Sequence, residues 1–434
     1  MDSPINIFWF RRDLRLDDNV GFYEALKSDL PVLPIFIFDS EILDKLPKDD
    51  ARVTFIHETL QTMRQTLQDE YNSSIAIYHG KPLDIYKQLV KDYDISTVFT
   101  NCDYEPYATK RDGEIEDFLS TNAIVFKTFK DQVIFEKDEV VKKDGNPYVV
   151  YTPYSRTWLD NFNDNDLEIY DTLSYLDNLV EHTRLPNLSL SDIGFQKSLQ
   201  DIKLYEVTPT LIQEYEATRN FPAKDNTSRL GPHLRFGTVS VRKMIKIAMA
   251  EENITFMKEL IWREFFMQIL WHFPHTKDQS FKSKYDRIEW RNNEDEFKTW
   301  CEGKTGYPLV DAGMRQLNET GFMHNRVRML VGSFLCKHLL IDWRWGEAYF
   351  AEKLHDYEMA SNVGNWQWVA GSGVDAAPYF RIFNPTTQID KFDKEKNYIK
   401  KWIKEYGTEN YPKKMVDHKE ARERCLETYK AAVS

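Results

Sequence analysis

Three side chains that could act on a flat, polar guest lie within one short stretch. Glu259, Trp262 and Arg263 stand in the sequence ELIWREF at spacings of three and four residues, so in a helix they share one face. A carboxylate, a flat ring and a guanidinium on one face suit a ligand that is both stacked and hydrogen-bonded. The alternative is a Glu259–Arg263 pair on a helix beside a core tryptophan. The stretch by itself leaves both interpretations open.

A second aromatic stretch covers residues 359–385. It places Trp366 and Trp368 two residues apart, among glycines and amide side chains. A buried tryptophan needs a partner for its N–H group. The stretch predicts either a wall against which a flat ring lies or a tightly packed helical core.

The segment NTSRLGPHLRFG, residues 226–237, could bind phosphate. Thr227, Ser228 and Gly231 offer hydroxyls and exposed N–H groups ahead of a helix, and Arg229 adds positive charge. The same residue types also cap helices without any ligand. The chain contains no Walker A and no G-x-G-x-x-G pattern, which argues against P-loop chemistry and against Rossmann dinucleotide binding.

The segment MHNRVRM, residues 323–329, combines an amide, a thioether and a guanidinium. Asn325 and Met329 are four residues apart, so they lie on one helix face. Arg328 stands in an apolar helix, where a buried guanidinium needs a carboxylate partner. Asp356 is a candidate for that partner, and the sequence by itself does not pair the two.

The elements that must position these groups differ along the chain. Apolar strands alternate with helical patterns at the start, which predicts a doubly wound parallel sheet over about residues 1–130. Residues 131–200 predict a long connector, and residues 201–434 predict an all-helical domain. The strands are expected at 5–10, 32–38, 75–78 and 97–100, and the helices between them at 19–27, 51–70 and 83–91. In such a sheet a ligand binds beyond the carboxyl ends of the strands, where the loop 101–107 is a candidate.

Composition narrows the class of protein. The net charge of -12 argues against a general nucleic-acid binder, although residues 391–434 carry 12 Lys and Arg against 8 Asp and Glu, so a local patch could contact phosphates. The four cysteines lack metal-ligand spacing, so we expect free thiols and no metal site. No apolar run reaches membrane-spanning length and no signal peptide is evident, so we expect a cytoplasmic protein that does not enter a membrane.

Several motifs together carry a family resemblance. They are FWFRRDLRLDDN at 8–19, TSRLGPHLRFG at 227–237, ELIWREF at 259–265, TGYPLVDAGMRQLNETGFMHNRVRM at 305–329, IDWRWGEAYF at 341–350 and the stretch 359–385. The chain resembles the photolyase/cryptochrome family, and within it most closely the class I cyclobutane pyrimidine dimer photolyases. The resemblance implies an N-terminal α/β antenna domain, a connector and a helical FAD-binding domain, in agreement with the segments above.

The resemblance also implies which residues hold FAD. The family pattern places Arg328 and Asp356 as an ion pair beside the flavin and Asn362 opposite flavin N5. Glu358 stands where a second aspartate is common in the family. The full set of implied FAD residues is Tyr215, Thr227, Ser228, Arg229, Leu230, Gly231, Arg263, Asn325, Arg328, Asp356, Glu358 and Asn362.

Electron transfer and substrate binding are implied in the same way. Trp366, Trp343 and Trp290 match the family's electron-hopping chain, with Trp366 nearest the flavin. The implied substrate residues are Arg219, Glu259, Trp262, Asn325, Arg326, Met329 and Trp368. The related (6-4) photolyases carry two histidines where Asn325 and Met329 stand, so the resemblance favours the cyclobutane dimer.

The implied activity is that of a carbon–carbon lyase that repairs pyrimidine dimers in DNA under blue light, using reduced FAD as the electron source. Two alternatives come from other classes: a cryptochrome-like photoreceptor that reduces FAD without repair, and a flavin-dependent electron carrier that does not bind DNA. Many family members add an antenna chromophore, a folate, a deazaflavin or a flavin, and Glu105 lies in the loop that would contact it. UV-damaged DNA is the expected partner of a monomer with no obligate protein partner.

Overall fold

The chain folds into two compact units. The computed structural model describes residues 3–163 and 167–434. The first unit comprises Met1–Glu139, Asp160–Leu204 and Leu230–Ala250, and the second comprises Val140–Leu159, Tyr205–Arg229 and Glu251–Ser434. The functional division into antenna domain, connector and FAD domain stays a prediction.

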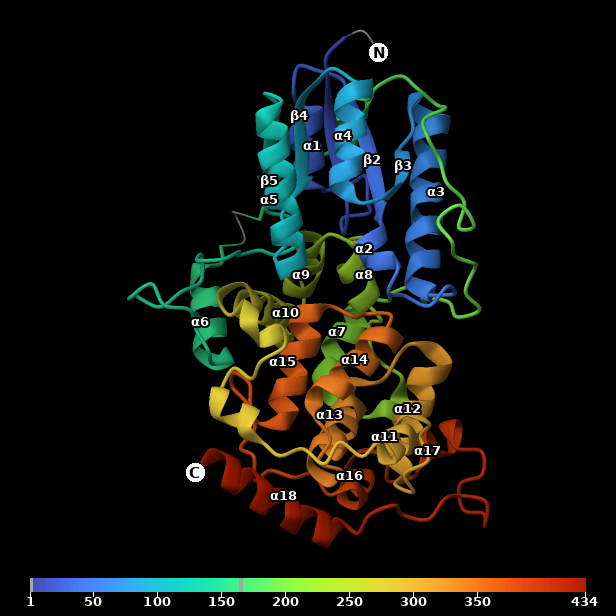
Figure 1. Ribbon diagram of the computed structural model, residues 1–434, viewed down its shortest axis with the longest axis vertical. Helices are drawn as coiled ribbons and strands as arrows, with labels where there is room; N and C mark the ends of the chain where they lie inside the picture. The colour runs from blue at the N-terminus through green and yellow to red at the C-terminus, as the bar shows by residue number, and fades with distance from the viewer. Residues whose placement is uncertain (1–2, 164–166) are drawn as a thin grey trace. The chain divides into compact units, whose positions relative to one another are not determined.

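The first unit is built on a five-stranded parallel sheet (Figure 1). Its strands are β1 (Ile5–Phe10), β2 (Val32–Asp39), β3 (Ala76–Gly80), β4 (Ile95–Asn101) and β5 (Val125–Phe129), in the spatial order β3-β2-β1-β4-β5. This order confirms the predicted doubly wound sheet. Because the order reverses between β1 and β4, the loops after these two strands border the place where such sheets bind ligands.

Helices cover both faces of this sheet. In β1, Phe8 and Phe10 pack in one core with α1 (Val20–Leu26) and α3 (Ala51–Tyr71), beside the short α2 (Ser40–Leu43). Ile7 and Trp9 pack in a second core with α4 (Pro82–Asp92) and α5 (Pro106–Thr121). Successive strand residues point to opposite faces, so a fully buried strand is apolar throughout.

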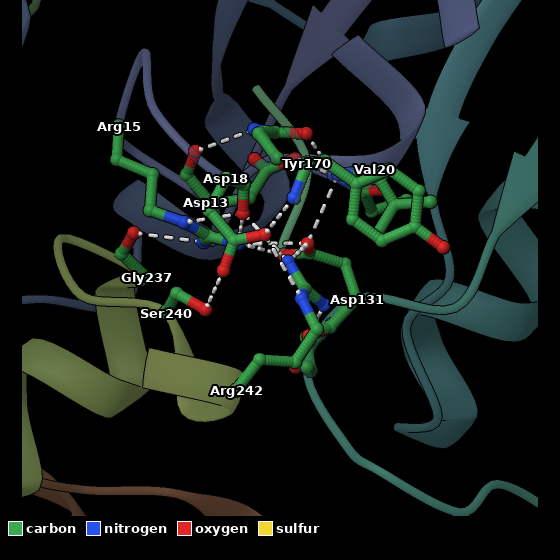
Figure 2. Close-up of polar contacts among 12 residues, drawn as sticks. Asp13, Arg15, Asp18, Val20, Asp131, Tyr170, Gly237, Ser240 and Arg242 are labelled. Carbon is green, nitrogen blue, oxygen red and sulfur yellow. Dashed lines mark hydrogen bonds and ion pairs between the residues drawn. The ribbon is translucent and has the colours of Figure 1, made fainter. Parts of the chain in front are cut away.

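A buried charge network holds α9 (Val241–Met249) within the first unit (Figure 2), and Arg15 of that network also donates to the carbonyl of Gly237, the C-cap residue of α8 (Gly231–Phe236). The Arg242 guanidinium lies 3.1 Å from an Asp18 carboxylate oxygen and 2.9 Å from an Asp131 one, and Arg15 contacts Asp131 at 2.7 Å. Ser240, which caps α9, also donates to Asp18. Burial by itself would raise the pKa of Asp131, but Arg15 and Arg242 hold it at about 2. The Asp131 carboxylate is therefore charged, and it is paired with two arginines, as a buried charge must be.

The second unit is helical. Its core joins Val331, Leu335, Trp343 and Trp366, among others. No strand is assigned among its described residues. The helices are α6 (Tyr151–Asn161, which extends into the first unit), α7 (Pro209–Thr218), α10 (Ile254–His272), α11 (Glu294–Cys301), α12 (Pro308–Thr320), α13 (Asn325–Ser333), α14 (Trp343–Lys353), α15 (Met359–Ala370), α16 (Pro385–Phe392), α17 (Asn397–Trp402) and α18 (His418–Val433), with a π-helical turn at Phe334–His338.

Within residues 3–163 and 167–434 the chain carries neither a membrane-spanning helix nor a metal-binding cluster. No helix there is long and apolar enough to cross a bilayer. The same ranges hold no group of three or more His, Cys, Asp and Glu side chains that could bind a metal ion. The four cysteines are free thiols, and Cys102, Cys336 and Cys425 are buried.

Candidate functional site

Helix α10 carries Glu259, Trp262 and Arg263. It starts after Asn253, whose side chain accepts from the Thr255 N–H. Arg263 pairs with Glu358 at 3.2 Å, and Glu259 pairs with Arg219, the C-cap residue of α7. Glu259 and Arg263 thus find their partners on other elements. The alternative of an ion pair within α10 is not what the structure shows, because the Glu259 carboxylate binds Arg219.

Trp262 is stacked on Tyr151, a residue that sequence reasoning missed. The two ring centroids are 3.5 Å apart and the ring planes differ by 7°. The Tyr151 hydroxyl donates to the Lys258 carbonyl at 2.9 Å, and its N–H donates to Asp375 at 3.2 Å. Tyr151 therefore fixes one face of Trp262. The only hint in the sequence is the run VVYTPY, residues 149–154, inside the predicted connector.

Helix α13 brings the amide, thioether and arginine side chains close together at its start. Asn325 is its exposed first residue, and Met329 lies one turn on, half-buried. Arg326 donates to the Asn220 side chain at 3.2 Å and reaches the Met329 sulfur at 3.5 Å.

Arg328 and Asp356 form a bidentate ion pair. The two guanidinium nitrogens lie 3.1 and 2.8 Å from the two carboxylate oxygens, and Arg328 also donates to the Met323 carbonyl at 2.7 Å. The side chains are 25% and 20% exposed. The pair is therefore half-buried, whereas the apolar helix sequence had suggested full burial. A planar, two-pronged arrangement of this kind gives geometric specificity as well as energy.

Asn362 is oriented by a residue that no sequence pattern indicated. Its side-chain amide donates to the Glu347 side chain at 2.9 Å and to the Glu347 carbonyl at 3.1 Å, which links α15 to α14. With both hydrogens used in this way, the Asn362 carbonyl oxygen is left as an acceptor. Burial raises the pKa of Glu347, and the Asn362 hydrogen bond opposes that rise.

The stretch 227–231 is held by backbone contacts and by charge. Ser228 accepts the Glu206 N–H at 2.8 Å through its carbonyl. Arg229 has a left-handed backbone (φ 56°), pairs with Asp225 and lies 3.5 Å above the Phe322 ring. Leu230 and Gly231 open α8 and belong to the first unit. Tyr215, on α7, packs edge-on against Phe256 at 5.4 Å.

The three tryptophans of the proposed electron chain differ in burial. Trp366 and Trp343 are 3% and 1% exposed and share one core, and Trp290 is half-buried against that core. Trp290 meets the Tyr429 ring edge-on at 5.9 Å. Trp368, on α15, is half-buried on the same core. Trp366 and Trp343 are thus both buried, and Trp290 is the one of the three that reaches solvent.

Glu105 lies in the first unit, after the carboxyl end of β4. It is the N-cap of α5 and pairs with Arg12 at 3.3 Å and with Arg235 at 3.4 Å. Arg11, which follows β1, pairs with Asp112 at 2.6 Å. A charged cluster therefore borders the switch point of the sheet, where a second ligand would bind.

Comparison with known proteins agrees with this architecture. Residues 6–171 match the family model described as DNA photolyase, and residues 256–408 match the FAD binding domain of DNA photolyase. A deoxyribodipyrimidine photo-lyase from Synechococcus sp. is 35% identical, and the match covers 96% of this chain and 94% of that protein.

Solved structures give the same result. A bacterial class III photolyase from Agrobacterium tumefaciens has a TM-score of 0.88 and 33% identity, and covers 100% of this chain and 98% of its own. An archaeal photolyase from Sulfolobus tokodaii, solved with two FAD molecules, has a TM-score of 0.82 and 32% identity, and covers 99% and 100%.

A parallel α/β unit and a helical unit, with ion-paired arginines on α10 and α13, together with these matches place the chain among the FAD-binding photolyase-type proteins. The chain belongs to the DNA photolyase family, and its residues 256–408 match the FAD binding domain of that family.

The residues present fit FAD. The Thr227 hydroxyl is buried and has no hydrogen-bond partner among the described residues. A phosphate oxygen would supply that partner, because a buried polar atom without one is costly. Arg263 and Arg328 are held by Glu358 and Asp356, and guanidinium groups so fixed recognise phosphate and flavin oxygens.

Proposed function

We propose that the protein repairs cyclobutane pyrimidine dimers in DNA with light, as a deoxyribodipyrimidine photo-lyase. One observation carries the proposal. Helix α10 places Glu259 and Trp262, the proposed substrate residues, directly beside Arg263, whose partner Glu358 precedes Asn362 by four residues. One helix thus borders both the proposed cofactor side and the proposed substrate side. Full-length similarity to proteins named deoxyribodipyrimidine photo-lyase supports this assignment.

FAD would be held by residues from several elements. Thr227, Ser228 and Arg229 would contact its phosphates, together with Leu230 and Gly231. Tyr215, Arg263, Asn325, Arg328, Asp356 and Glu358 would complete its binding. Reduced FAD, when bound and excited by light, supplies one electron and takes it back. The Asn362 carbonyl oxygen, oriented by Glu347, would accept the N–H that reduced flavin carries at N5.

The dimer, two linked neighbouring bases of one strand, would enter flipped out of the duplex, since enzymes acting on bases take them out of the stack and a damaged base costs less to extrude. Trp262 and Trp368 would stack on the dimer. The Tyr151 ring packs against the other face of Trp262. Arg219 and Arg326 would contact phosphates, and Asn325 and Met329 would line the pocket. Neither residue 325 nor residue 329 is histidine, which supports the cyclobutane dimer over the (6-4) product.

Glu259 would stabilise negative charge on a dimer carbonyl, in the manner of an oxyanion-hole donor. Trp366, Trp343 and Trp290 would carry electrons from the surface when oxidised FAD is reduced by light. We further propose an antenna chromophore, a folate, a deazaflavin or a flavin, near Glu105. We also propose that the protein is a monomer, which sedimentation of the purified protein tests. It would act in the cytoplasm without an obligate protein partner.

The repair assay tests the function directly. Purified, reduced protein is mixed with UV-irradiated oligothymidine, and absorbance is followed under blue or near-UV light as the 5,6 double bonds return, with a dark control. Recovery in the light and none in the dark is the expected result. A protein that binds and photoreduces FAD but gives no recovery would instead be a photoreceptor. In the Glu259→Ala variant, we expect a lower repair yield per photon at unchanged FAD content.

A further inference from the structure

Glu259 is held by a partner that DNA could remove. Arg219 pairs with Glu259 from the end of α7, and neither side chain is deeply buried: 26% of Arg219 and 32% of Glu259 is exposed. The contact therefore borders solvent. A guanidinium on a carboxylate at such a position can exchange to another anion.

The other groups facing Glu259 cannot replace Arg219 as a positive partner. Tyr151 and Tyr215 lie close by, and burial followed by the Glu259 charge raises the pKa of each hydroxyl, so both stay neutral. Arg263, one turn along α10, pairs with Glu358. Arg219 is thus the cation that lowers the pKa of Glu259 against the effect of burial.

The pKa of Glu259 is set by two opposing effects, burial and the contact with Arg219. Burial raises the pKa of Glu259 above its usual value, and the charge and hydrogen bond of Arg219 offset only part of that rise. If Arg219 leaves, only the burial effect remains, and burial favours the neutral acid.

A second arginine shows where Arg219 would go. Arg326 donates to the neutral Asn220 side chain and lies over the Phe392 ring at 4.5 Å. It has no carboxylate partner among the described residues. Burial and then the charge of Arg219 lower the pKa of Arg326, so the two guanidinium groups repel each other. A phosphate between two such groups relieves the repulsion and binds both.

The chemistry proposed for Glu259 needs the neutral form. An ionised carboxylate only accepts hydrogen bonds, whereas a protonated one donates one. Negative charge developing on a dimer carbonyl is stabilised by a donor and repelled by a carboxylate.

We propose that DNA binding moves Arg219 from Glu259 to a backbone phosphate, and that Glu259 then takes a proton from solvent and faces the dimer as a neutral hydrogen-bond donor. This inference rests on the repair function proposed above. Arg219 acts as a positioning residue that couples DNA binding to the protonation of Glu259. One proton moves from water to the Glu259 carboxylate, and no bond of the DNA changes in this step.

Proton uptake on binding tests the proposal. Oligothymidine carrying one dimer is titrated in the dark into the FAD-loaded protein, by calorimetry in two buffers of different ionisation enthalpy across the neutral pH range. We expect uptake that approaches one proton per complex, with a matching protonated-carboxyl band in the infrared difference spectrum. In Glu259→Gln both signals should be lost. Equal uptake in the wild-type protein and in Glu259→Gln would overturn the proposal.

Variants of the arginines separate coupling from simple binding. In Arg219→Gln the carboxyl band should already be present before DNA is added, so uptake on binding falls, and Arg219→Lys should restore it. Arg326→Gln is the matched control: DNA binding weakens, but uptake per complex persists. Loss of uptake in Arg326→Gln to the same extent as in Arg219→Gln would contradict the assignment to Arg219. Light-driven repair by a wild-type protein that takes up no proton would refute this inference alone, whereas absence of repair would refute the proposed function.

Discussion

Asn362 donates both hydrogens of its side-chain amide to Glu347, one to the carboxylate at 2.9 Å and one to the backbone carbonyl at 3.1 Å. Half of this contact involves the Glu347 backbone, which a substitution leaves in place. The other half depends on the carboxylate. The amide orientation at the proposed flavin N5 position is therefore set by a residue on another helix.

Removal of the Glu347 carboxylate should loosen the orientation of Asn362. A lost hydrogen bond costs about 1 kcal/mol, or about fivefold in an equilibrium constant. In Glu347→Leu we expect reduced FAD to reoxidise in air several-fold faster than in the wild-type protein, followed by flavin absorbance in the dark. Glu347→Gln keeps an acceptor oxygen and is the control. Equal reoxidation in all three proteins would show that the Asn362 orientation does not matter.

Tyr151 should contribute to dimer binding through Trp262. A stacked aromatic pair is worth about 0.5–1.5 kcal/mol beyond its buried area, so Tyr151→Ala should weaken binding of dimer-containing DNA by about two- to tenfold at unchanged FAD content. Tyr151→Phe keeps the ring and loses only the hydroxyl bond to Lys258. We expect its affinity to stay near that of the wild-type protein, measured by fluorescence anisotropy. If Tyr151→Phe weakens binding as much as Tyr151→Ala, the hydroxyl and not the stack is responsible.

Trp290→Phe should block light-driven reduction of oxidised FAD but spare repair by protein that has been reduced chemically. Trp290 is the outermost, half-buried member of the proposed chain, so its loss cuts the route to external reductants. Trp300→Phe is a stringent control, because Trp300 lies 6.3 Å from Trp366 in the same core yet is not on the proposed route. Photoreduction is followed by the loss of oxidised-flavin absorbance under blue light. Normal photoreduction in Trp290→Phe, or its loss in Trp300→Phe, would require a different route.

The strands predicted correctly are those whose short sequence segments are apolar throughout. Strands β1 and β2 are fully buried apolar runs, and the expected ranges match them within one residue. Strand β5 was missed because it lies at the sheet edge, mostly exposed, with Lys127 and Thr128 in its middle. Helix α5 was missed because its stretch TKRDGE has little apolar periodicity.

For the candidate site, too, the sequence predicts what lies within one segment but not the contacts between segments. The ELIWREF spacing correctly placed Glu259, Trp262 and Arg263 on one helix. Their partners Arg219, Tyr151 and Glu358 come from other elements, and only folding brings them together. Glu347 lies in the motif IDWRWGEAYF and Tyr151 in the run VVYTPY, but neither stretch shows which side chain its residue will contact, so these two roles appear only in the folded structure.

Close packing around Trp366 can be tested at Gly346. A Cβ atom at this position would lie 2.1 Å from a Trp366 ring carbon, so alanine must displace the indole. We expect Gly346→Ala to lower the free energy of unfolding by about 1–3 kcal/mol and to slow photoreduction. Gly113, within α5, has no atom within 4 Å of such a Cβ, so Gly113→Ala should stabilise the protein by about 0.5–1 kcal/mol. Urea unfolding measures both changes, and equal effects of the two substitutions would contradict the packing argument.

His338 predicts how stability depends on pH. It is 1% exposed, and its ring lies 2.8 Å, nitrogen to nitrogen, from His418 at the start of α18. Burial, and then the charges of His418 and Arg424, lower its pKa to about 3, against about 6.5 in an unfolded chain. Between these two values the unfolded state binds more protons, so the contribution of His338 to stability is present above about pH 6.5 and is lost as the pH falls toward 3.

Replacement of His338 should therefore flatten the acid limb of the stability curve. In His338→Gln the free energy of unfolding should fall less steeply between these pH values, by up to about 1.4 kcal/mol per pH unit. His79→Gln, at an exposed position on β3, should leave the slope unchanged. Urea unfolding of the three proteins at a series of pH values gives the slopes. Parallel curves for His338→Gln and the wild-type protein would mean that His338 is already charged in the folded state, and that α18 packs against a cation at this position.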